Sequence, residues 1–78
     1  MQQTILFPGI ASNPGILGGK PVIEGTRIPA ALILGQLAGG VSTDEIMREY
    51  HLSAEQIRAV LSYAAQLVSG ETVYATAP

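Results

Sequence analysis

Proline and glycine crowd the first 29 residues, and this density limits what the chain can fold into. Four of its five prolines and five of its nine glycines lie there. Such a segment excludes a helix and leaves short extended pieces between turns. β-branched residues flank Glu24 and Gly25, where glycine accepts a positive φ. We therefore predict an N-terminal β-hairpin over residues 22–28, with further short strands at residues 10–11 and 16–17.

A helical pattern begins after Pro29, which suits the start of a helix, and Gly39 ends the first helix at about residue 38. This helix is apolar around most of its circumference, so it needs cover on every side. A chain of 78 residues without cysteine has little core with which to provide that cover. We expect a homodimer, and the candidate residues for its interface are Leu32, Ile33, Leu34 and Leu37.

Two further helices carry clear start signals. Ser42 with Glu45, and Ser53 with Gln56, have the spacing of capping boxes. They predict helices over about residues 43–50 and 54–69, separated by three residues. Apolar side chains on the second of these recur at helical spacing and so lie on one face of the helix: Ile57, Val60, Leu61, Ala64, Leu67 and Val68.

The expected fold is mostly α, of the α+β class: an N-terminal hairpin followed by a three-helix bundle. Two helices joined by a three-residue turn have the outline of a helix-turn-helix, although the same outline fits a corner that only packs. We expect one domain over residues 10–69, an N-terminal extension over residues 1–9 and a C-terminal tail over residues 70–78.

The charge balance disfavours strong non-specific binding to nucleic acid, because the chain has a net charge of −2 and a pI near 5.1. A site-specific dimer is still compatible with it, since two-fold symmetry doubles any basic patch. For each residue that is a candidate for DNA binding, the alternative interpretation is an ordinary solvated surface residue. The DNA-binding candidates are Arg48, Gln56, Arg58, Ser62, Tyr63 and Gln66.

No residue pattern favours catalysis, a metal or a cofactor. The chain has no cysteine and a single histidine, His51, so no metal-ligand set is complete. Residues 15–20 resemble a phosphate-binding loop only in part, because Pro14 and Pro21 replace required residues. We therefore expect a non-enzymatic protein. Without an export signal or a long apolar run, we expect a cytoplasmic one that does not bind membranes.

The segment Gly-Gly-Lys-Pro-Val-Ile-Glu-Gly-Thr-Arg-Ile-Pro over residues 18–29 resembles the signature of a small prokaryotic family, the domain of unknown function 433. The likeness extends over roughly residues 10–68. The positions that match the hairpin motif are Gly19, Lys20, Pro21, Gly25, Thr26, Arg27 and Pro29. Thr26 and Arg27 are expected to anchor the hairpin to the bundle or to a partner.

This resemblance implies a homeodomain-like or winged-helix-like bundle, often dimeric, and no catalytic residue. Some members look like antitoxins that pair with a PIN-like ribonuclease toxin encoded beside them. Our leading hypothesis is an antitoxin-like protein that binds such a toxin and also operator DNA through its helix-turn-helix. The alternative is a homodimeric interaction module without a nucleic-acid role.

Overall fold

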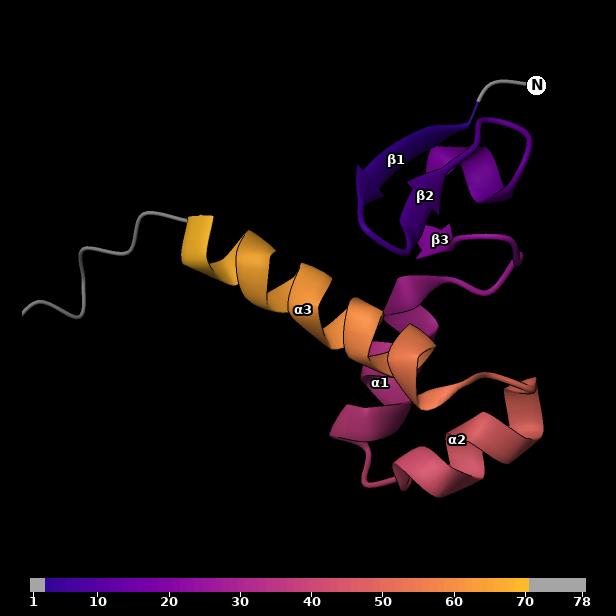
Figure 1. The fold of residues 1–78 in the computed structure, drawn as a ribbon, viewed down its shortest axis with the longest axis vertical. Coiled ribbons are helices and arrows are strands. Elements are labelled where there is room, and N and C mark those ends of the chain that lie inside the picture. The colour runs from indigo at the N-terminus through magenta and orange to yellow at the C-terminus, as the bar shows by residue number, and fades with distance from the viewer. Residues whose placement is uncertain (1–2, 71–78) are drawn as a thin grey trace, which may run out of the picture.

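The computed structural model describes residues 3–70, which form a small sheet followed by three helices (Figure 1). This is the expected α+β class with the strands at the N-terminus. The predicted tail beyond residue 70 and the first two residues of the predicted extension lie outside the described residues. The elements are β1 (Thr4–Phe7), β2 (Ile10–Ser12), a short 3-10 helix η1 (Leu17–Gly19), β3 (Val22–Ile23), α1 (Ala30–Ala38), α2 (Thr43–Tyr50) and α3 (Ala54–Gly70).

The sheet is antiparallel with strand order β1-β2-β3. A tight turn at Pro8 and Gly9 joins β1 to β2, and Gly9 has a φ of +90° that favours glycine. The register shifts between Ile5 and Phe7, which is a β-bulge. Strand β1 thus lies in the segment expected to be an extension, where no strand was predicted.

The prediction of a hairpin over residues 22–28 was correct for its turn and wrong for its second strand. The Thr26 N–H donates to the Ile23 carbonyl over 2.9 Å, and Gly25 has a φ of +82°. The returning segment meets β3 at a single bridge between Val22 and Pro29, where the Ile23 N–H donates to the Ile28 carbonyl over 2.9 Å, so it does not form a strand of its own. Residues 10–11 are a strand as predicted, whereas the strand predicted at residues 16–17 is replaced by η1.

The three helices have nearly the predicted bounds, because local caps determine where they start. The Ser42 hydroxyl accepts from the Glu45 N–H over 3.1 Å at the start of α2. At α3, Ser53 and Gln56 form both bonds of a capping box: 2.8 Å from the Ser53 N–H to the Gln56 side chain and 3.1 Å from the Gln56 N–H to the Ser53 hydroxyl. Helix α2 ends at His51, which has a left-handed φ of 57°.

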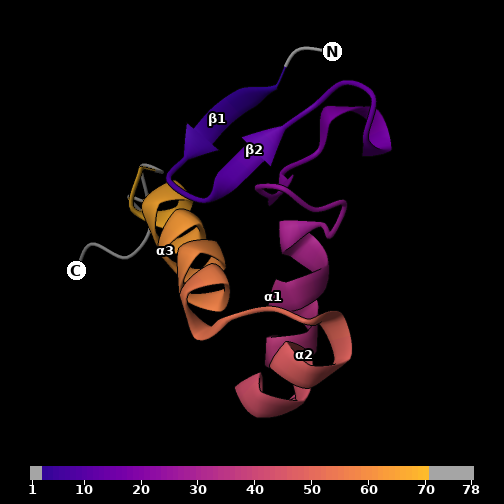
Figure 2. The ribbon, with the colours of Figure 1, turned by 45° about the vertical axis from the view of Figure 1, so that its right-hand side comes forward.

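One hydrophobic core joins the sheet to all three helices. On the sheet, Ile10 faces the helices together with its cross-strand neighbours Phe7 and Ile23. Fully buried isoleucines of α1 and α2, Ile33 and Ile46, complete the centre with residues of α3. The sheet lies at one end of the long axis and α2 at the other (Figures 1 and 2). Within residues 3–70, no helix has the length and apolar character needed to cross a membrane.

Candidate interaction surface on helix α3

Helix α3 has two halves with different surroundings. Ile57 and Val60 in the first half are buried in the core. The same apolar stripe then becomes exposed: Leu61, beside the groove between α2 and α3, is 45% exposed, and Leu67 and Val68 farther along the helix are 55% and 67% exposed. Figure 1 shows this half of α3 running out beyond the sheet. The apolar face expected on this helix is therefore buried only in its N-terminal part. We call these three side chains the distal α3 surface.

The distal α3 surface itself carries no charge, although Leu61 at its N-terminal end shares a groove with Asp44 and Arg58. After Arg58, no residue of α3 carries a charged side chain. The small side chains of Ala64 and Ala65 lie between the larger ones and allow another chain to approach the helix closely. At its base, the Tyr63 ring lies 6.0 Å from the Phe7 ring of β1, which fixes the helix against the sheet. Large exposed apolar side chains on a rigid element are typical of a protein interaction site.

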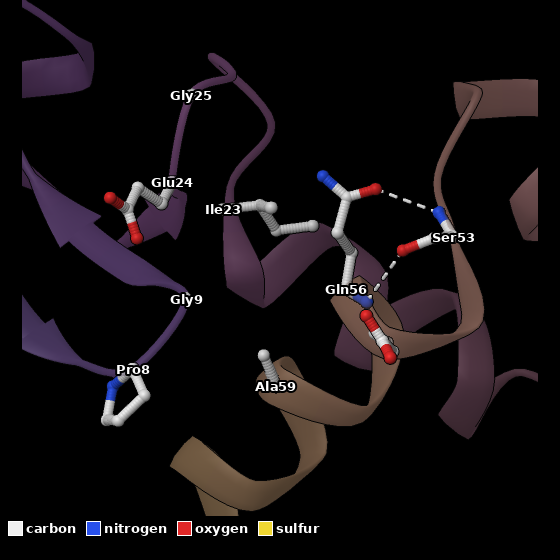
Figure 3. Close-up of a pocket in the computed structure, with 9 residues that line it drawn as sticks. Pro8, Gly9, Ile23, Glu24, Gly25, Ser53, Gln56 and Ala59 are labelled. Atoms are coloured by element: carbon white, nitrogen blue, oxygen red, sulfur yellow. Dashed lines mark hydrogen bonds between the residues drawn. The ribbon is translucent and has the colours of Figure 1, made fainter.

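A shallow open hollow of about 560 Å³ lies where α3 begins (Figure 3). The β1–β2 turn at Pro8 and Gly9, the β3 turn and the first two turns of α3 surround it. Its two charged side chains, Glu24 and Glu55, are both acidic, so the hollow is unsuited to phosphate. Ser53, which also lines it, is held by the helix cap. Among residues 3–70, no cluster of three or more metal-binding side chains is present.

The six DNA-binding candidates do not lie on one surface. Arg58, Ser62 and Gln66 are exposed on α3, and Arg48 is exposed on α2. The Gln56 side chain is instead engaged in the helix cap, and Tyr63 is half-buried against β1.

Arg58, the exposed basic residue of α3, has acidic neighbours. Arg58 and Asp44 line opposite sides of a groove of about 340 Å³ between α2 and α3, and Glu55 and Arg58 line another hollow together. A phosphate approaching Arg58 therefore meets carboxylates as well, which weakens its attraction to this part of the protein.

The predicted interface residues of α1 lie mostly inside the protein. Ile33 is fully buried in the chain's own core, and Leu34 and Leu37 are half-buried against it. Only Leu32 is exposed, at 39%. The expectation that Ile33 contacts a second subunit was wrong, because the sheet and the other two helices already cover that side of α1.

The motif of residues 19–29 shapes the connection between the sheet and α1. The Ser12 hydroxyl donates to the Gly19 carbonyl over 2.6 Å, and the Pro21 carbonyl accepts from the Ala30 N–H over 3.0 Å. The Thr26 hydroxyl donates to the Ile23 carbonyl over 2.8 Å and accepts from the Ile28 N–H over 3.0 Å. Thr26 thus holds its own turn. Lys20 and Arg27 point to solvent as exposed residues.

Comparison with known proteins identifies a domain that this chain shares with its relatives, but it gives no activity for that domain. A family model described as "Protein of unknown function (DUF433)" matches residues 10–64. The uncharacterized protein y4eO of Sinorhizobium fredii is 39% identical over 56 residues, which cover 70% of this chain and 25% of the relative. The uncharacterized protein Rv2308 of Mycobacterium tuberculosis is 32% identical over 57 residues, which cover 73% of this chain and 24% of the relative. The chain thus spans about a quarter of the length of these relatives, and no solved structure matches it significantly.

Proposed function

This chain belongs to the DUF433 family, and from its surfaces we propose that it is a non-catalytic binding module that docks on a partner protein through the distal α3 surface. One observation carries the proposal: the apolar stripe of α3 is exposed at Leu61 and continues past the core as Leu67 and Val68. Burying a large aliphatic side chain contributes roughly 1.5–3 kcal/mol, so three half-exposed ones supply a useful part of a binding energy.

The shape and chemistry of this segment indicate how a partner would hold it. Residues 61–70 form a rigid helical rod of about 15 Å at the usual rise per residue. A helix of this kind binds in an apolar groove and contributes side chains three, four and seven residues apart. Since the rod carries no charge, the matching groove is apolar as well, and any charge complementarity lies around its edge.

We further propose that the partner is a PIN-like ribonuclease toxin encoded beside this chain, which makes the chain an antitoxin acting in the cytoplasm. The resemblance of residues 18–29 to a family that includes antitoxin-type proteins supports this partner class. The net charge of −2 also suits a basic, RNA-binding protein as the partner.

The proposal is tested by purifying the tagged chain from its native cells and identifying co-purified proteins by mass spectrometry. Recovery of one small nuclease-like protein near equal stoichiometry, lost in the Leu67→Glu variant, is the expected result. Gln66→Glu is the matched control, because it adds the same charge to the neighbouring exposed position. Retention of the partner by Leu67→Glu, or recovery of the chain alone, would contradict the proposal.

Operator DNA is a second candidate ligand, supported by the helix pair itself. Helices α2 and α3 are joined by three residues, and Arg48, Arg58 and Ser62 are exposed on them. The β1–β2 turn lies close to the N-terminal part of α3. A Cβ added at Gly9 would lie only 2.8 Å from the Ala59 Cβ. We propose on these grounds that the domain is a homeodomain-like or winged-helix-like variant, in which α3 is the DNA-reading helix.

DNA binding is tested by fluorescence anisotropy with the DNA upstream of the gene. Arg58→Glu should abolish site-specific binding, whereas Lys20→Glu, a charge reversal on the exposed loop before β3, should preserve most of it. Absence of specific binding by the unmodified chain would contradict the operator proposal. It would favour the alternative, an interaction module without a nucleic-acid role.

A further inference from the structure

The groove of about 340 Å³ between α2 and α3 is lined mainly by apolar side chains. Four of its seven lining residues are apolar: Met47, Ala54, Ile57 and Leu61. Ile57 is 2% exposed and belongs to the core, whereas Leu61 is 45% exposed. The groove volume is at the lower end of the roughly 300–1,000 Å³ of ligand clefts, so it suits a single large side chain rather than a folded element.

The two charged side chains of this groove have opposite signs and come from different helices. Asp44 lies in the first turn of α2, and Arg58 lies on α3. The other charged side chains of the two helices do not line the groove: Glu45, Arg48, Glu49 and Glu55. Arg48 and Glu55 carry the opposite charges one turn away on the same helices, so each charge of the groove acts only at short range. A ligand in the groove therefore meets a carboxylate from α2 and a guanidinium from α3.

We infer that this groove receives an apolar side chain of the partner protein, on a segment that places a basic residue beside Asp44 and an acidic residue beside Arg58. The inference rests on the proposed function, because Leu61 lines the groove and also begins the distal α3 surface, so one partner covers both. Alternate side chains of an extended segment point to the same face. The order basic-x-apolar-x-acidic, in either chain direction, thus brings all three side chains to the groove. The flexible thioether of Met47 adapts to the shape of the apolar one.

The charges of the groove favour a different protein over the chain's own segments. Residues 71–78 contain no basic residue that could pair with Asp44. Residues 20–24 have the required order, from Lys20 through Val22 to Glu24, but Val22 is 2% exposed within β3. A folded second copy therefore cannot insert it. Exposed ion pairs add little affinity, so the two charges mainly select which segment binds.

The test uses two capped pentapeptides as probes, Lys-Ser-Leu-Ser-Glu and the reverse order Glu-Ser-Leu-Ser-Lys, titrated into the full chain. The chain has two methionines, so the NMR signal of the isotope-labelled Met47 methyl group is readily assigned and reports on the groove. At least one peptide should shift this signal with a dissociation constant in roughly the millimolar range, as one leucine and two exposed ion pairs provide. Replacing the leucine with serine should weaken binding at least about tenfold.

Asp44→Lys should change which peptide binds best, an effect that loss of folding would not produce. With two basic side chains in the groove, this variant should bind Glu-Ser-Leu-Ser-Glu at least about threefold more tightly than either mixed-charge peptide. Glu45→Lys is the matched control, because it makes the same change at the next exposed position, outside the groove. It should keep the preference of the unmodified chain for the mixed-charge peptides.

Two results would overturn the inference. One is a Met47 signal that no peptide shifts. The other is equal binding of the mixed-charge peptides, Glu-Ser-Leu-Ser-Glu and Lys-Ser-Leu-Ser-Lys by the unmodified chain. Because the peptides contact only the groove, neither result would affect the co-purification test with Leu67→Glu. Absence of a co-purified partner would in turn contradict the proposed function without changing the peptide measurements.

Discussion

Replacing Gly9 with alanine should destabilise the fold through two separate effects. The φ of +90° imposes backbone strain on alanine of about 1 kcal/mol. The added methyl group would also lie 2.8 Å from the Ala59 Cβ, closer than carbon atoms pack, and such overpacking costs about 1–3 kcal/mol. We therefore expect a loss of about 2–4 kcal/mol in the free energy of unfolding, a large share of what a small domain has.

Gly25→Ala separates the two effects. Gly25 has a similar φ of +82°, but nothing lies within 4 Å of its added Cβ, so only the strain of about 1 kcal/mol applies. Urea unfolding followed by circular dichroism suits a chain without tryptophan. In a double-mutant cycle, Ala59→Gly should recover part of the Gly9→Ala loss. Equal losses for Gly9→Ala and Gly25→Ala, with no coupling to Ala59, would refute the contact between the β1–β2 turn and α3.

Four further substitutions test local interactions by the same unfolding measurement. Ser53→Ala and Ser42→Ala should each cost about 1 kcal/mol, because each hydroxyl accepts one capping N–H bond and the Ser53 N–H keeps its bond to the Gln56 side chain; no loss in either variant would argue against these caps. Thr26→Val keeps the shape but removes both hydrogen bonds of the hydroxyl, for an expected loss of about 1–3 kcal/mol. His51→Gly should stabilise the chain by about 0.5–1 kcal/mol, because it relieves the left-handed φ of 57° at the end of α2; a loss of stability would show that the histidine ring makes contacts that matter.

The helices were predictable from the sequence because their limits are set by neighbours in the chain. The Ser53–Gln56 pair and Gly39 act within one turn of the helix end that they define. The sheet was predicted less well, because its pairing joins segments that are not adjacent. Ile10 is opposite Ile23 in β2 and β3, and only the folded topology brings these two segments together in addition to the local bond between Ile23 and Ile28.

The exposed surface of α3 illustrates a different limit of sequence patterns. Helical periodicity places Leu67 and Val68 on the same face as Val60, but it does not show where the core ends. The position at which the core ends along α3 depends on the length of α3 relative to the short helices α1 and α2. The apolar character of α1 led to the opposite error, since Ile33 was assigned to an interface although the chain's own sheet and helices cover it.

The proposal that the distal α3 surface binds a partner protein is tested most directly by NMR. The partner recovered from native cells is titrated into the isotope-labelled chain, and the changes in backbone chemical shift are mapped onto the helices. We predict that the largest changes fall on residues 61–70 and are absent in Leu67→Glu but present in Gln66→Glu. Changes confined to α2 and the first turns of α3, with residues 61–70 unaffected, would contradict the proposal.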